Sequence, residues 1–186
     1  MTAQWTSKLD RITTDFSSAF ADLTTEQLNW KPNPDTWSIA QNIEHLIIIN
    51  ESYYPILAAL HEGKYKTPWI GRIGFIVNLF GKTVLKAVDP ARRKKMKTFP
   101  IWEPSTGKVP GTILANFEKH QAELKQRIQA SQALPDKHIV IASPANGNVV
   151  YRLETAFDII VAHEQRHLEQ AKEVLQELVS RSKEVK

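Results

Sequence analysis

The sequence predicts an all-α fold, a four-helix bundle with a basic insertion between the second and third bundle helices. Three observations favour this fold. Apolar residues recur at helical spacing in four long segments of the chain. Prolines and glycines gather between these segments, where they would end helices. No internal repeat and no domain-splitting linker divides the 186 residues, so we expect one domain over residues 1–186.

The first segment carries an apolar stripe about five helical turns long. Its members are three or four residues apart, and they are Trp5, Leu9, Ile12, Phe16, Phe20 and Leu23. Thr24 followed by Gln27 has the spacing of a capping box, which predicts a short further turn ending near Trp30. Pro32 and Pro34 then exclude a helix from the next stretch, so we expect a loop there.

The second bundle helix has a clear start. Ser38 and Gln41 form another capping-box pattern. The apolar stripe that follows comprises Ile39, Ile43, Leu46, Ile47, Ile49, Tyr53, Ile56 and Leu60. Pro55 should kink the helix and Gly63 should end it.

The insertion, about residues 64–110, separates the second helix from the third. Residues 73–88 could form an amphipathic helix with Lys82 and Lys86 on its polar side. Pro90, Pro100, Pro104 and Pro110 break the part that follows, and Trp69, Phe99 and Trp102 give the insertion enough aromatic surface to dock on the bundle.

Charge is unevenly distributed along the chain. From Lys64 to Lys97 there are ten lysines or arginines and one acid, Asp89, which gives +9, whereas the whole chain carries +4 and the rest therefore −5. The densest part is the basic cluster Arg92–Lys97. We interpret this cluster as a solvated surface rather than a nucleic-acid or membrane contact.

The third bundle helix is expected to open at Thr112. Its stripe comprises Ile113, Phe117, His120, Leu124 and Ile128. His120 therefore faces the core, where a lone histidine is more often a hydrogen-bonded structural residue than a ligand, although it could line the same cavity as other histidines. Three breakers, Pro135, Pro144 and Gly147, predict a loop over residues 134–148.

The last helix is expected from about Tyr151 to Val179, with a frayed tail over residues 181–186. It carries His163 and His167, which are four residues apart and so lie on one helix face. Apolar residues flank this pair, so the helix face that carries both imidazoles is expected to face the core. The two rings could then bind one metal ion. Because a catalytic zinc site usually takes three protein ligands, a third must come from elsewhere.

The pair also reads H-E-x-x-H, which invites a metalloprotease interpretation with Glu164 as general base. The extended form of that motif is missing, and only a polar tail follows the helix. The third ligand is therefore expected upstream. His45, beside the buried stripe of the second helix, is the best candidate, whereas His61 and His138 are expected to be exposed.

Two motifs resemble the DinB-like family. One combines LTTEQLNWKP at 23–32 with WSIAQNIEHL at 37–46, and the other is H-x-x-R-H-x-x-Q at 163–170. The resemblance covers most of the chain and is weakest across the insertion. It implies a four-helix bundle whose second and fourth helices supply a histidine triad for one divalent metal ion, commonly zinc or nickel. Carried onto this sequence, the ligands are His45, His163 and His167.

The resemblance also bears on activity. Family members of known activity include transferases and isomerases that use low-molecular-weight thiols, and others are assigned only as candidate metal-dependent hydrolases. We therefore expect a metal-dependent enzyme acting on a small molecule, either a thiol-dependent S-transferase or a hydrolase. The alternative is a non-catalytic metal-binding or ligand-sensing bundle. Polar residues that could orient the ligand rings are Gln41, Asn42, Glu164 and Gln170.

Composition sets the remaining expectations. The chain has no cysteine, so a thiol cofactor would be external. It shows neither a secretory signal nor a long apolar run, which favours a cytoplasmic protein without a membrane or nucleic-acid partner. A homodimer is left open. We expect the basic insertion to form part of the wall of the site, where it would receive an anionic substrate.

Overall fold

The computed structural model describes residues 2–91, 98–134 and 138–184, and these residues are mostly helical. The α-helices are α1 (Thr2–Phe20), α2 (Thr25–Asn29), α3 (Ile39–Glu51), α4 (Tyr54–His61), α5 (Gly74–Ala87), α6 (Ile113–Ala130) and α7 (Leu153–Glu184). Short 3-10 helices are η1 (Trp69–Arg72), η2 (Pro100–Trp102) and η3 (Ser131–Ala133). The strands β1 (Val140–Ser143) and β2 (Asn146–Arg152) form one antiparallel hairpin.

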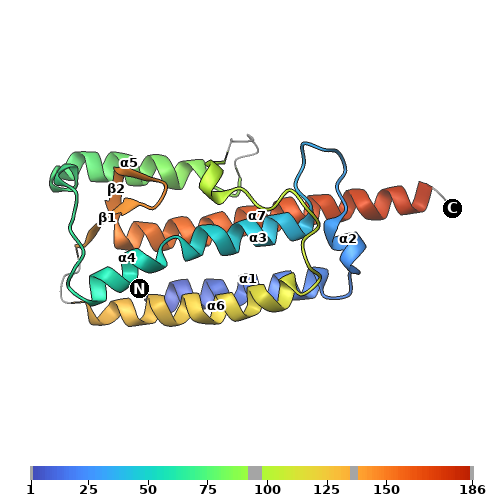
Figure 1. Cartoon of the computed structure of the whole chain (residues 1–186), viewed down its shortest axis with the longest axis horizontal. Helices are drawn as coiled ribbons and strands as arrows, with labels where there is room; N and C mark the ends of the chain where they lie inside the picture. The colour runs from blue at the N-terminus through green and yellow to red at the C-terminus, as the bar shows by residue number, and fades with distance from the viewer. Residues whose placement is uncertain (1, 92–97, 135–137, 185–186) are drawn as a thin grey trace.

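Four helices form the bundle (Figure 1). α1 packs against both α6 and α7, and α3 packs against the same two helices, so the four enclose one core. α5 lies outside this bundle, against α7 and β2. This arrangement confirms the predicted helical fold. No helix in the part of the chain that the structure describes is long and apolar enough to cross a membrane.

Both predicted capping boxes are present. At the start of α3, Ser38 Oγ accepts a hydrogen bond from the Gln41 backbone N–H, and the Gln41 side chain accepts one from Ser38 N–H, each at 3.1 Å. The same reciprocal bonds join Thr24 and Gln27 at α2. Because these bonds satisfy N–H groups that lack a partner within the helix, they define where α3 begins and hence where its side chains point.

The predicted interruption near Pro55 is also present. α3 ends at Glu51, and Pro55 lies in the first turn of α4, a position where its missing N–H costs no helical hydrogen bond. Gly63 follows α4 with φ of 65°, a left-handed conformation that glycine adopts without steric cost.

The apolar stripes predicted from the sequence form the core. Residues that are at most 2% exposed come from all four bundle helices and include Leu9, Phe16, Phe20, Ile43, Leu46, Phe117, Leu124, Ile160 and Ala171. Burying each large side chain of this kind stabilises the fold by roughly 1.5–3 kcal/mol before conformational entropy is subtracted. The histidines of α3 and α7 therefore lie between well-packed turns of their helices.

One segment differs from the prediction. Residues 134–148 were expected to form a loop, but most of this stretch belongs to the β1–β2 hairpin, and α7 begins only at Leu153. The breakers Pro144 and Gly147 lie at and just after the hairpin turn. Tertiary contacts stabilise the short strands: Ile141 and Val150 are fully buried, and Tyr65 Oη accepts a hydrogen bond from Ala142 N–H at 2.8 Å.

The C-terminal tail also differs from the expected fraying, because α7 continues to Glu184. Arg181 contributes to this extension. Its Nη2 donates to the Pro32 carbonyl at 3.3 Å, and its guanidinium lies 5.5 Å from the centre of the Trp30 ring. The last helix is therefore anchored to the loop that precedes α3.

The insertion contains the predicted amphipathic helix, α5, with Lys82 and Lys86 exposed. The expectation that its aromatic residues dock is correct only for Trp102, which is 9% exposed. Trp69 and Phe99 are 74% and 51% exposed. The basic cluster Arg92–Lys97 lies outside the described residues.

The segment that returns from the insertion is pinned along α3. Ser105 donates from its backbone N–H and from Oγ to Glu44 Oε2, both at 2.8 Å, and its carbonyl accepts from Gln41 Nε2 at 2.8 Å. Trp102 Nε1 donates to Ser52 Oγ at 3.2 Å. These bonds hold the backbone of η2 beside the middle of α3, where His45 lies.

Candidate metal centre

His45 lies in the middle of α3 and is 2% exposed. Its Nδ1 is 2.6 Å from the Trp102 carbonyl oxygen. A carbonyl can only accept, so Nδ1 carries the proton and Nε2 keeps a free lone pair. The position of η2 therefore selects the tautomer of this ring and turns Nε2 toward α7.

His167 is oriented in the same way from α7. Its Nδ1 is 2.7 Å from Asn42 Oδ1. Asn42 uses its Nδ2 to donate to the Ser38 carbonyl at 2.9 Å, which directs Oδ1 at the histidine. His167 therefore donates through Nδ1 and also presents the lone pair of Nε2. Of the four polar residues expected to orient the rings, only Asn42 has a hydrogen bond to one of them in the described structure.

The three Nε2 atoms converge. His163 Nε2 lies 3.1 Å from His167 Nε2 and 3.4 Å from His45 Nε2. Within the described ranges, these three residues are the one group of histidine or carboxylate side chains with metal-site spacing, and their ligand atoms all lie within 4.8 Å of one another. The third ring belongs to His45, which lies on a different helix, 118 positions before His163 in the sequence.

Burial lowers the basicity of all three rings. It brings the pKa of His45 down to about 4, against the opposing effect of the Trp102 carbonyl. Burial also lowers the pKa of His163 and of His167 well below the usual histidine range, and the neighbouring imidazoles and Arg166 lower them further. At neutral pH the rings are neutral, which is the form that binds a metal ion.

Sequence reasoning missed three groups around the triad. The Trp102 carbonyl could not be identified from side-chain chemistry. Trp37 packs its ring against His45 at 4.8 Å and stacks on His167 at 5.9 Å between ring centres. Arg166 is 7% exposed and donates to the Ala87 carbonyl at 3.0 Å, which places a buried cation beside the triad.

The whole arrangement can be compared with known proteins. A model of the DinB superfamily matches residues 8–171 of the chain. The chain belongs to the DinB superfamily. Comparisons with curated proteins and with solved structures give no match.

The residues of this DinB protein fit a divalent metal ion. Zinc–nitrogen bonds of about 2.0–2.1 Å at tetrahedral angles would separate two ligand nitrogens by roughly 3.3–3.4 Å. The observed separations of 3.1 and 3.4 Å are close to that value. Three neutral imidazoles are also a donor set that zinc and nickel accept. His45, His163 and His167 could therefore hold one divalent ion.

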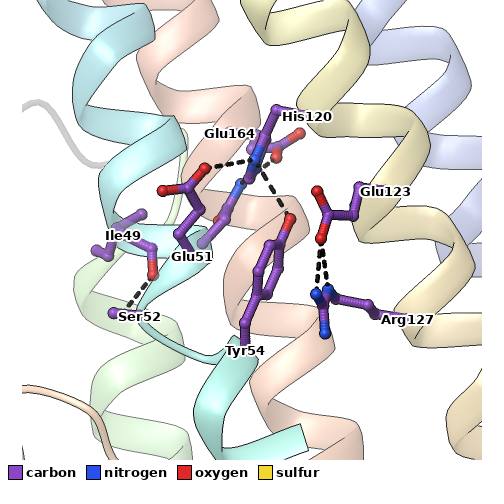
Figure 2. A network of polar contacts seen from close by, with 9 residues as sticks. Ile49, Glu51, Ser52, Tyr54, His120, Glu123, Arg127 and Glu164 are labelled. Carbon is purple, nitrogen blue, oxygen red and sulfur yellow. Dashed lines mark hydrogen bonds and ion pairs between the residues drawn. The ribbon is translucent and has the colours of Figure 1, made fainter. Parts of the chain in front are cut away.

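His120 belongs to a different polar region of the DinB bundle (Figure 2). It is 5% exposed, and its Nδ1 lies 3.3 Å from Tyr54 Oη and 3.7 Å from Glu51 Oε1. Its Nε2 lies 3.3 Å from Asn50 Nδ2. These partners of His120 are side chains of α3 and α4, which confirms its interpretation as a hydrogen-bonded core histidine. His61 and His138 are exposed, as expected.

Glu164 lies in the region of His120, not in the triad. Its side chain is fully buried, at 0% exposure. Asn50 Nδ2 donates to its Oε1 at 2.7 Å. Burial raises the pKa of Glu164 to about 7, against the opposing effects of Gln121 and Asn50. Adjacent residues on a helix point about 100° apart, so His163 and Glu164 face different sides of α7.

Proposed function

We propose that this DinB protein is a metal-dependent enzyme in which His45, His163 and His167 bind one divalent ion, zinc or nickel. One observation carries the proposal. In the part of the chain that the structure describes, no fourth histidine or carboxylate joins the triad. Catalytic zinc sites have this composition, with three protein ligands and one position left for water or substrate, whereas structural sites use four.

The neutral donor set supports an activating role for the ion. Three imidazoles leave the charge of the ion uncompensated. A divalent ion held there would supply a Lewis acid that lowers the pKa of water or of a thiol at the open position. The chain has no cysteine, so the thiol would be an external low-molecular-weight cofactor.

The protein contributes orientation and charge. Asn42 and the Trp102 carbonyl hold two rings in the ligating tautomer. Trp37 covers the faces of those rings. His163 is the most exposed of the three residues, so we place the substrate on its side of the site.

The neighbouring cation favours an anionic substrate. Arg166 acts on the pKa of both His163 and His167 through its charge, so it would also attract an anion at the open position. The insertion reaches the site through two backbone carbonyls, because the Ala87 oxygen accepts from Arg166 and the Trp102 oxygen from His45. A small molecule or a thiol that bears carboxylates is the substrate class we propose.

We do not extend the general-base prediction to Glu164. Its carboxyl group interacts with Asn50 and Gln121, and no described contact joins it to a ring of the triad. Among the expected reactions, transfer of an external thiol and hydrolysis both remain consistent with a neutral three-histidine site.

The test combines metal analysis with a reaction screen. Purified protein loaded with zinc or nickel would be assayed with low-molecular-weight thiols and electrophilic acceptors, and in parallel with ester and amide substrates. His163→Ala is the control, and it should abolish any activity while circular dichroism stays unchanged. A loaded site saturated by four protein ligands, with no exchangeable position in X-ray absorption spectra, would instead identify a non-catalytic metal-binding bundle.

A further inference from the structure

The described chain exposes an unusual set of large apolar side chains, and most belong to the insertion. Six such residues are strongly exposed: Trp69 (74%), Phe75 (72%), Leu79 (58%), Ile101 (60%), Phe99 (51%) and Val179 (45%). Five of the six lie between residues 69 and 101. Single exposed apolar residues are ordinary, but a group on one element indicates a contact surface.

Two of these exposed residues, Phe75 and Leu79, lie on α5. Its inner side packs on the protein through Val77, which is 3% exposed, and Gly81, where an added Cβ would lie 3.2 Å from the Thr155 side chain. Phe75 and Leu79 are one turn apart and point outward. An ordinary surface helix is apolar on the packed side alone, whereas α5 is apolar on both sides.

Cations share the outer side of α5. Lys82 and Lys86 follow Phe75 at seven and eleven positions, so they lie on the same helix face. Arg72, in η1 before α5, is exposed as well. Residues 63–88 contain no acid, and no described carboxylate forms an ion pair with any of these three cations. We refer to Trp69, Arg72, Phe75, Leu79, Lys82 and Lys86 as the α5 face.

We propose that the α5 face docks on the surface of a lipid bilayer that contains anionic lipids. Exposed Trp, Phe and Leu side chains enter the boundary between headgroups and acyl chains, and lysines and arginines on the same helix attract anionic headgroups. The two contributions occur together here, and stable peripheral binding generally needs both. The earlier expectation of no membrane partner rested on the lack of a spanning segment and on the interpretation of the basic cluster Arg92–Lys97 as a solvated surface, and the α5 face includes neither.

Charge argues for this occupant over a second copy of the chain. A symmetric pair formed through the α5 face would bring three cations of each copy together with no acid on α5 or η1 to compensate them. An anionic surface compensates all of them. In Figure 1, α5 lies on the opposite side of the α3–α7 layer from α1 and α6.

Docking would also bring the metal centre near the bilayer. Arg166, next to His167, is bonded to Ala87 at the end of α5. The α5 face does not contribute a ligand to the triad, so membrane binding and metal binding can be tested separately.

The experiment is vesicle co-sedimentation with the full chain. Vesicles of phosphatidylcholine alone are compared with vesicles of phosphatidylcholine and phosphatidylserine, at low and at high salt. We expect binding to the anionic vesicles only, weakened by salt. The double variants Phe75→Ser/Leu79→Ser and Lys82→Glu/Lys86→Glu should each lower the apparent affinity about tenfold or more. Trp69→Ala should weaken it further.

Matched controls use exposed residues elsewhere. Val179→Ser removes an exposed apolar residue of α7, and Lys8→Glu/Lys119→Glu reverses two exposed lysines on α1 and α6. Both should bind like the unaltered protein. Equal loss in the lysine control would show attraction of the whole charged protein and overturn the proposal. So would an absence of binding to anionic vesicles.

A dimer in light scattering that Phe75→Ser/Leu79→Ser abolishes, without vesicle binding, would identify a second copy as the occupant. Metal content should stay constant throughout.

Discussion

Two regions of this bundle bury histidines, the triad on α3 and α7 and a second region around His120 on α6, and they differ in what the rings face. At the triad, His45 and His167 donate through Nδ1 to fixed acceptors and direct Nε2 at a third ring. At the second region, His120 has side-chain neighbours at both ring nitrogens, Tyr54 and Asn50. Burial lowers the pKa of His120 to about 4, similar to His45. Burial and basicity therefore do not distinguish the two regions, whereas convergence of free lone pairs makes only the triad a candidate metal site.

The largest expected difference is in metal content. His45→Ala, His163→Ala and His167→Ala should each lower the bound metal from about one ion per chain towards zero, because a site that keeps two ligands is weak. His120→Ala should retain its ion. Elemental analysis after gel filtration measures both. Full metal occupancy in the His163→Ala/His167→Ala double variant would refute the triad as the binding site.

Two asparagines on α3 give a matched pair for the next test. Asn42 orients His167, so Asn42→Ala should weaken metal affinity about tenfold to a hundredfold, with titration against a competing chelator as the measurement. Asn50 hydrogen-bonds Glu164, so Asn50→Ala should leave metal affinity unchanged.

The cost of Asn50→Ala should appear in folding instead. The variant removes the donor to a fully buried carboxyl group, which destabilises the fold by about 1–3 kcal/mol. Urea unfolding measures this free energy. If both variants changed metal affinity equally, the two regions would be one coupled site.

His120 and Glu164, the two titratable groups of the second region, should affect the pH dependence of stability differently. In the folded protein the pKa of His120 is about 4, below its ordinary 6.5. The unfolded chain therefore binds a proton that the native ring does not, and stability falls as pH drops from about 6.5 to 4. One group contributes about 1.4 kcal/mol per pH unit within this window. His120→Gln should remove that part of the slope in unfolding experiments on chelated protein.

Glu164 should act with the opposite sign. Its folded pKa of about 7 lies above the ordinary 4.5, so the native state holds a proton that the unfolded chain has released. Stability from this group is present below about pH 4.5 and is lost as pH rises through about 7. The side chain of the Glu164→Gln variant cannot ionise, so its stability should not decline as pH rises through about 7. The same pH profile for Glu164→Gln and the unaltered protein would contradict a raised pKa.

The smallest effect is expected from removing the metal. The apolar core spans four helices and does not use the triad to close, unlike a zinc finger. Chelation should leave helical circular dichroism intact and lower the melting temperature by a few degrees, since about 1 kcal/mol corresponds to roughly 2–4 °C at this size. Loss of most helical signal on chelation would show that the ion is structural.

The sequence alone predicted the helices and most of the candidate ligands that they carry. Capping boxes at Thr24 and Ser38 and the apolar period are local patterns, readable without knowledge of the fold. The spacing of His163 and His167 is likewise a property of one helix. Selecting His45 as the third member needed either the family resemblance or the elimination of other histidines, and the structure brings all three together.

Tertiary structure decided the features that depend on distant partners. The β1–β2 hairpin forms because Ile141 and Val150 are buried against other elements, which a four-residue strand does not reveal. The Trp102 carbonyl that orients His45 is 57 positions away and is a backbone group that every residue type possesses. The burial of Glu164 and the exposure of Phe75 and Leu79 likewise depend on which helix packs beside them. A helical period gives the direction of a side chain relative to its own helix, but only packing determines what lies in that direction.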